Sequence, residues 1–274
     1  LHRHYRRQRQ MCIRDRTIPY AENIIPGKIF ASDFDLGIMG EAYYDAGSEA
    51  NYGGDFSAWN NGWAYRNDNV DIQNNEDPLS NGYNVGWIES DEWMQYTLKD
   101  PTSGLYNIKV RVATEDNDGS FYFKINDNQV TDLINVPNTE SWTNWSFVNI
   151  DSLVVYDTDD KFVFQVKTGT FNLGFFEFER IGDINLLQTK YISSFTLSEN
   201  SININFNKNL DNTLTLNKSD FKLNINDQEK DIQNVSYSSS PRSIIINFDT
   251  EIQPTDIITI SYTGNSVRAL DGET

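Results

Sequence analysis

The stretch that decides the fold reads YNIKVRV, from Tyr106 to Val112. Its apolar residues are separated by single polar ones. A period of two places alternate side chains on opposite faces of a strand, so this pattern predicts a half-buried antiparallel strand. The same alternation recurs at 121–125 and 162–166, and turn-forming Asn, Asp and Gly residues lie between these segments. The spacing predicts a β-sandwich.

The composition changes after Gly182-Asp183, because all six tryptophans lie at or before residue 145. Short alternating segments continue, for example at Ser201–Asn207. No segment of about a dozen residues has a sustained helical stripe of apolar side chains. We therefore expect an all-β protein, with a large sandwich at 26–181 and a smaller immunoglobulin-like β-sandwich at 188–274. The chain ends in a turn signal, so we expect this second domain to be truncated.

The first sixteen residues differ from the rest. They hold both histidines, the only cysteine and six of the 22 basic residues, but one of the 40 acidic residues, which leaves a net charge of −23 over 17–274. The run Met11–Arg16 matches the translation of a transposon-end sequencing oligonucleotide. We therefore interpret residues 1–16 as a non-native, adapter-derived segment and 17–25 as a linker. The alternative is a basic targeting arm.

Residues 17–274 contain neither His nor Cys. Ser-His-Asp and Cys-His catalysis are excluded there, as are zinc sites that use those ligands. The negative charge argues against nucleic-acid binding, which needs a basic face. No apolar run approaches the ~20 residues of a membrane helix. Strong acidity and the lack of Cys are typical of a secreted or surface-exposed bacterial protein, and we expect that location.

The segment GYNVGWIESDEWMQY, from Gly82 to Tyr96, contains the first candidate functional residues. It sets Trp87 in a glycine-flanked turn and then enters a strand that carries Trp93. A third tryptophan, Trp142, stands in a polar run, whereas Trp145 is expected in the core. An indole face on a rigid β scaffold suits a sugar ring, because the ring C–H groups stack on it while nearby amides and carboxylates bind the hydroxyls. The alternative is that these tryptophans are half-buried core residues.

An ordered set of short motifs surrounds this segment. They are Ile25–Ile29, Gly40–Asp45, Ala64–Arg66, Val70–Ile72, Val136–Thr139, Trp142 with Trp145, Phe171–Leu173 and Phe176–Phe178. Together with Gly82–Tyr96 they resemble family 6 carbohydrate-binding modules over residues 26–181.

The resemblance implies a jelly-roll β-sandwich with a ligand cleft in the loops at one edge. It implies that Trp87 and Trp142 clasp one sugar ring while Asn172 binds its hydroxyls. We expect Glu89 to act as a further hydroxyl acceptor. A second site on the concave sheet face would use Trp93. The long aromatic loop either packs under itself or extends the sugar groove, and its candidate residues are Trp59, Trp63 and Tyr65.

The resemblance also implies a structural calcium ion as a candidate cofactor. Glu179, near the end of the last strand of the module, is the candidate metal ligand. Ser32 stands where the family usually has a second ligand, a glutamate. Because Ca²⁺ takes six or more oxygen ligands, such a site would depend on loop carbonyl groups.

These observations predict a non-catalytic, monomeric chain that binds an oligo- or polysaccharide such as a β-glucan, xylan or agar-like polymer. It would direct a secreted glycoside hydrolase, or another polysaccharide-active parent protein, to its substrate. Residues 188–274 resemble bacterial immunoglobulin-like repeats, which usually act as spacers. One alternative is a glycosidase or lyase that uses the carboxylates Glu89, Asp91 and Glu92. Another is an adhesion or structural protein in which Trp87 and Trp142 are buried.

Overall fold

The computed structural model describes residues 17–46, 65–66 and 69–272. These residues form four antiparallel β-sheets with three short 3-10 helices, η1 (Ala31–Asp33), η3 (Ile184–Leu186) and η4 (Lys218–Asp220). The prediction of an all-β protein is confirmed. The tryptophans Trp59 and Trp63 and the segment 1–16 lie outside the described residues.

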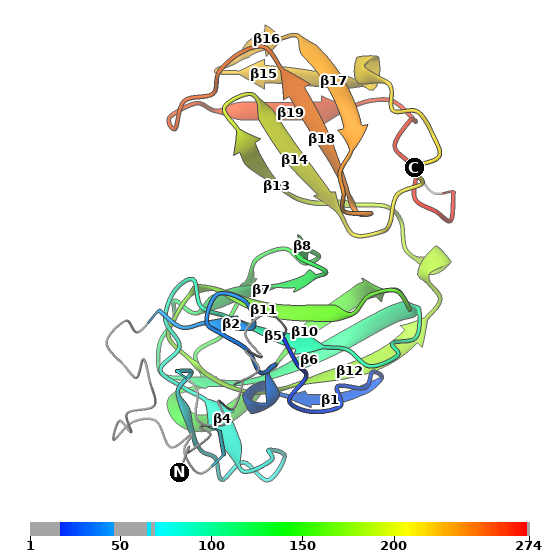
Figure 1. Ribbon diagram of the computed structural model, residues 1–274. Helices are drawn as coiled ribbons and strands as arrows, with labels where there is room; N and C mark the ends of the chain where they lie inside the picture. The colour runs from blue at the N-terminus through cyan, green and yellow to red at the C-terminus, as the bar shows by residue number, and fades with distance from the viewer. Residues whose placement is uncertain (1–16, 47–64, 67–68, 273–274) are drawn as a thin grey trace, which may run out of the picture.

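Two six-stranded sheets build the first unit (Figure 1). The first sheet has the order β10-β6-β12-β4-β3, with β1 also paired to β12; its bounds are β1 Gly27–Phe30, β3 Ile72–Asn74, β4 Tyr83–Val85, β6 Gly104–Thr114, β10 Ser141–Val155 and β12 Asn172–Gly182. The second sheet has the order β2-β5-β11-β7-β8, with β9 also paired to β7; its bounds are β2 Tyr43–Tyr44, β5 Trp93–Thr97, β7 Ser120–Ile125, β8 Asn128–Gln129, β9 Ile134–Asn135 and β11 Lys161–Thr168.

The core of this unit is rich in phenylalanine. Phe123 and Phe162, on the second sheet, meet Phe176 of the first sheet with ring centroids 5.7 Å and 5.2 Å apart. All three side chains are fully buried. Phe123 and Phe162 are apolar positions of the alternating segments, so the period of two correctly places them on the core face.

A smaller pair of sheets forms the second unit. One has the order β13-β14-β18-β17 (Tyr191–Ser198, Ser201–Phe206, Ser243–Phe248 and Ile232–Tyr237), and the other β16-β15-β19 (Gln228–Lys230, Phe221–Ile225 and Ile258–Tyr262). Its separate core is dominated by aliphatic side chains such as Ile204, Leu223 and Ile246. A second, smaller β-sandwich therefore follows the first, and its assignment as immunoglobulin-like stays a prediction.

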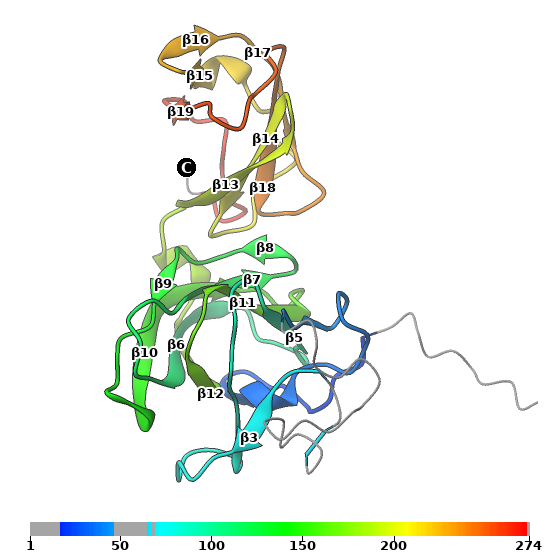
Figure 2. The ribbon, with the colours of Figure 1, turned by 90° about the vertical axis from the view of Figure 1, so that its left-hand side faces the viewer.

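A buried ion pair connects the two units. Arg242, just before β18, donates from Nη2 to Asp159 Oδ2 at 2.7 Å and from Nη1 to the carbonyl of Val154 at 3.2 Å. The two charged side chains are 1% and 2% exposed. Tyr156 adds a contact, because its hydroxyl accepts a hydrogen bond from the backbone N–H of Asn209. The second unit thus lies against the end of the first that carries β7 and β8, whereas β3 lies at the opposite end (Figures 1 and 2).

Candidate functional site

Trp87 occupies the turn that follows β4. Its backbone is left-handed, with φ of 46°, and its side chain is 46% exposed. The next residue, Ile88, is fully buried and anchors the turn to the core. The turn therefore holds the indole outward while its neighbour fixes the backbone.

Gly86 lets two amide side chains approach this turn. A Cβ at Gly86 would lie 3.0 Å from Asn172 Oδ1 and 3.2 Å from Gln73 Nε2, which is too close for an ordinary contact. The side-chain amides of Asn172 and Gln73 therefore lie side by side under the residue that precedes Trp87. Gln73 is a residue that the sequence reasoning missed, although it directly follows the motif Val70–Ile72.

Asn172 also connects the turn to Trp142. Its Nδ2 donates to the backbone carbonyl of Trp142 at 2.8 Å. Asn172 is the first residue of β12 and Trp142 lies at the start of β10, so the bond joins two strands that are not neighbours in the sheet. The Trp142 side chain is 37% exposed. Both indoles are thus accessible, contrary to the alternative in which they are buried.

A cluster of carboxyl groups lies behind the Trp87 turn. Burial, together with the charge of Asp45 and a hydrogen bond to it, raises the pKa of Glu92 to about 9. The backbone N–H of Ala46 donates to Glu92 Oε1 at 3.2 Å. Burial and the charges of Asp45 and Glu89 raise the pKa of Asp71 to about 6. Glu92 is therefore protonated at neutral pH, and Glu89, which is exposed, is the acid of this group that can reach a ligand.

The Glu92–Asp45 pair does not have the geometry of a glycosidase. Both residues are buried, with 7% and 8% exposure, and their carboxyl groups are joined by a hydrogen bond. A retaining or inverting glycosidase needs its two carboxyl groups about 5 Å or more apart, with the glycosidic bond between them. A directly bonded pair leaves no such space.

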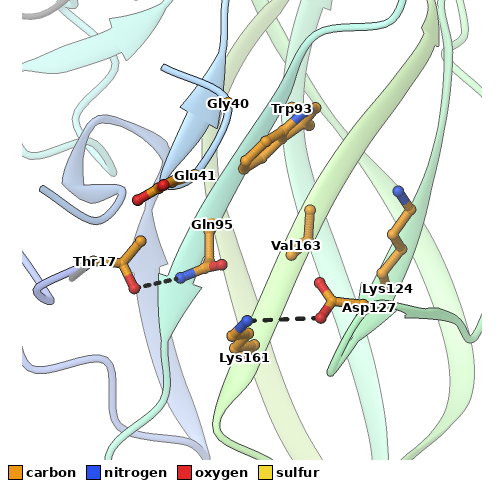
Figure 3. Close-up of a pocket in the computed structure, with 9 residues that line it drawn as sticks. All are labelled: Thr17, Gly40, Glu41, Trp93, Gln95, Lys124, Asp127, Lys161 and Val163. Carbon is orange, nitrogen blue, oxygen red and sulfur yellow. Dashed lines mark hydrogen bonds and ion pairs between the residues drawn. The ribbon is translucent and has the colours of Figure 1, made fainter. Parts of the chain in front are cut away.

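Trp93 belongs to a different surface, on the outer face of the second sheet. It is half-buried and lines an open trough of about 730 Å³ together with Gln95, Lys124, Lys161 and Val163. Figure 3 shows these side chains along adjacent strands, with Glu41 and Thr17 on one side and Asp127 on the other. Trp87 is not among the residues that line this trough. The separate roles of Trp87 and Trp93 stay a prediction.

The other predicted residues take separate positions. Tyr65 packs between Tyr20 and Tyr83, with ring centroids 5.5 Å and 4.4 Å away, and its hydroxyl donates to Asp33. These contacts explain Tyr65 as a packing residue. Its proposed role in extending the sugar groove stays a prediction.

Glu179 is exposed on β12, beside a shallow groove that also contains the cations Lys28, Lys109 and Arg180. Ser32 is fully buried, and its hydroxyl donates to Asp33 and accepts from Asn81. Within the described ranges, no group of three or more His, Cys, Asp or Glu residues has the geometry of a metal site. The groove also contains Glu177, and calcium stays a prediction.

The described residues thus form a β-sandwich that exposes two tryptophans at one end, with amide side chains between them. The family model described as carbohydrate binding module (family 6) matches residues 64–180. This match confirms the family 6 part of the predicted resemblance for these residues, and it supports the predicted function of non-catalytic carbohydrate binding. The comparison with curated proteins gives no match.

Several solved structures are similar to the first unit. The C-terminal family 6 module of a marine laminarinase from Zobellia galactanivorans is 27% identical, covers 41% of this chain and 90% of its own, and has a TM-score of 0.37. A module of lichenase 5A from Cellvibrio mixtus, in complex with cellotriose, is 24% identical over 41% and 87% of the two chains, with a TM-score of 0.37. A β-1,3-glucan binding module from Bacillus halodurans is 17% identical over 58% and 99%, with a TM-score of 0.42.

None of the helices in the described part of the chain has the length and apolar character that a membrane crossing requires.

Proposed function

We propose that the first unit binds a polysaccharide without cleaving it, at the end of the sandwich that carries Trp87 and Trp142. The observation that carries this proposal is the exposure of both indoles on either side of Asn172, within the region that matches the carbohydrate-binding family. Exposed indoles cost solvation free energy unless a ligand covers them. The two aromatic faces would stack on one sugar ring, while Asn172, Gln73 and Glu89 bind its hydroxyls.

Binding by stacking and hydrogen bonds alone has modest strength. We expect a dissociation constant of ~10⁻³ to 10⁻⁵ M. Such affinity is useful when the module is tethered to an enzyme, because the tether raises the local substrate concentration. We therefore propose that the chain comes from a secreted or cell-surface bacterial protein that acts on polysaccharides, and that it binds as a monomer.

Isothermal titration of the whole chain with laminarihexaose, cellohexaose, xylohexaose and agarohexaose tests the proposal. At least one should bind, and the double variant Trp87→Ala/Trp142→Ala should lower its affinity at least ~30-fold. The control is Tyr191→Ala, which removes an aromatic ring of the second unit that is 53% exposed, more than either tryptophan. Wild-type affinity in the double variant would count against the site. Release of reducing sugar by the purified chain would instead favour the alternative of a glycosidase or lyase that uses carboxylate residues.

A further inference from the structure

A groove of about 630 Å³ lies beside Trp142, on the outer face of the first sheet. Its walls are the end of β3 with the loop that follows it, 73–78, and the start of β10, 142–145, and its floor includes Asn84 and Arg111. This volume is typical of a ligand site. We call it the outer groove. Among the residues that line it, only Trp142 belongs to the sugar site predicted from the sequence.

A β-bulge explains why two tryptophans line the same groove. Residues 142 and 145 are an odd number apart, so a regular strand would point them to opposite faces. The pairing of β10 with β6 shifts register between Ser141 and Ser146, which re-aims the side chains in between. Trp145, expected in the core, is therefore half-buried and faces the outer groove.

The indole of Trp145 rests against the sheet. A Cβ at Gly174, on β12, would lie 3.3 Å from Trp145 Cζ3 and 3.2 Å from Arg111 Cγ. Gly174 thus makes room for Trp145 and Arg111 side by side on the outer face. Both side chains are backed by the strand, so they form a preformed surface rather than a mobile one.

Arg111 is held in place and its charge is compensated. Its Nε donates to Asp77 Oδ2 at 2.8 Å and its Nη2 to Asp77 Oδ1 at 3.2 Å, and the guanidinium stacks 4.6 Å from the ring centroid of Phe147. The Asp77 side chain is 2% exposed and that of Arg111 13%. Because Arg111 and Asp77 neutralise each other, the net charge of the lining comes from Glu76. A groove of this kind offers hydrogen bonds without attracting an anion.

The outer groove starts where the Trp87–Trp142 site ends. Gln73 lines the groove, and its amide also lies beside Gly86 and Asn172 under the Trp87 turn. The wall contributes further amides, and the buried Nδ2 of Asn75 has no hydrogen-bond partner among the described residues. An amide N–H left unpaired by folding costs free energy, and Asn75 belongs to the wall that a polar ligand would meet.

We propose that a neutral polysaccharide chain runs from the Trp87–Trp142 site along the outer groove, with a second sugar unit stacked on Trp145. Arg111 and the side-chain amide of Gln73 donate to its hydroxyls. The Nδ2 groups of Asn84 and Asn144 already donate to the backbone carbonyls of Val85 and Thr139, so these two residues offer their amide oxygens as acceptors. The module then recognises an internal run of several sugars, and Trp145 determines the preference for long over short chains. This inference rests on the proposed function, because it extends the ligand of that same site.

The test compares a long and a short ligand of one polymer. Titrations with laminarihexaose and laminaribiose, or with the corresponding pair from whichever polymer binds, are made on the whole chain and on Trp145→Ala. The affinity for the hexasaccharide should fall at least ~10-fold, while the affinity for the disaccharide stays within about twofold. Trp145→Leu, which keeps apolar packing on Gly174, should give the same selective loss. Trp93→Ala is the matched control, because it removes a half-buried tryptophan that does not line the outer groove and should change neither affinity by more than about twofold.

Three results would overturn the inference. One is an equal loss for both ligands in Trp145→Leu. Another is no loss for the hexasaccharide. The third is tighter binding of hexagalacturonate than of any neutral hexasaccharide, because the groove would then select anions. If Trp87→Ala/Trp142→Ala abolishes binding and Trp145→Ala does not change it, the proposed function stands and the outer groove is not part of it.

Discussion

The trough beside Trp93 and the outer groove beside Trp145 both carry tryptophan and amide side chains. They differ in the hydrogen bonds and ion pairs that their polar groups make within the protein. In the trough, Gln95 Nε2 donates to Asp35 Oδ2 at 2.8 Å, and Lys124 Nζ donates to Gln165 Oε1 at 2.9 Å. Lys161 and Asp127 form an exposed ion pair at 3.6 Å. The outer groove instead rests on the buried Arg111–Asp77 pair. Its amides Asn84 and Asn144 donate to backbone carbonyls rather than to other side chains.

The difference teaches that a tryptophan on an open sheet face is not enough to identify a sugar site. A sugar needs donors that are oriented yet still available, because binding must replace the hydrogen bonds that its hydroxyls make with water. The trough offers amide and lysine groups that are already paired with other side chains. The outer groove holds its guanidinium still through one carboxylate, which leaves other N–H groups of Arg111 for a ligand.

The largest effect should follow from breaking the ion pair under the outer groove. Asp77→Ala leaves the Arg111 charge unpaired in a mostly buried position, which should lower the free energy of unfolding by about 3 kcal/mol. Asp127→Ala, in the exposed pair of the trough, should lower it by less than about 1 kcal/mol. Urea unfolding followed by tryptophan fluorescence reports the first unit alone, because every tryptophan lies at or before residue 145. Equal effects of the two changes would remove the contrast between the surfaces.

A smaller effect should appear with pH at the Trp87 end. The folded protein keeps the Glu92 proton up to about pH 9, whereas the unfolded chain loses it near the ordinary value of 4.5. Between these two pH values the folded protein therefore becomes less stable relative to the unfolded chain as the pH rises. Asp71, with a pKa of about 6, has the same effect on stability. We expect the free energy of unfolding to fall by at least ~1 kcal/mol between pH 5 and pH 8.

Glu92→Gln mimics the protonated acid, so it should flatten this pH dependence and stabilise the first unit at pH 8. The control is Glu115→Gln, at an exposed position of the same unit whose charge is not among the causes of either pKa shift. Thermal unfolding of the three proteins between pH 5 and pH 9 checks the prediction. If the Glu92→Gln curve keeps the wild-type slope, the buried carboxyl pair is not its source.

The sequence predicts much of the fold because alternation is a local property. The core-facing residues of β6 and β7 follow directly from the period of two. In β11 the alternating residues Val163 and Gln165 are buried as well, so the strand is covered on both faces. Trp87, Trp142 and Asn172 are brought near one another, and the family resemblance anticipates this grouping. The position of Trp145 could not be predicted, because the bulge in β10 depends on its pairing with β6. The partner of Arg111 lies 34 residues away along the chain, and no local pattern indicates it.

Gln73 illustrates a different limit. Gln73 lies in β3, next to the amide residues Asn74 and Asn75, and its residue type does not distinguish it from them. Its proximity to Asn172 depends on the absence of a side chain at Gly86. Gln73 could have been predicted by combining the Val70–Ile72 motif, which it follows, with the glycine before Trp87. Each of these is visible in the sequence, but their contact is a consequence of the β3–β4 pairing.

The smallest effect should come from Trp93→Ala. The polar groups around Trp93 are already paired, and its indole is half-buried, so the trough should add little to the binding of a neutral glycan. We expect the affinity for the hexasaccharide used above to change less than about twofold, with one binding event per chain in the calorimetric isotherm. An isotherm with two binding events, one of which disappears in Trp93→Ala, would instead establish the trough as the second site that the family resemblance implies. In that case the trough would bind sugar although its amide and lysine groups are engaged in internal hydrogen bonds. An accessible indole would then be sufficient for a sugar site, without free hydrogen-bond donors beside it.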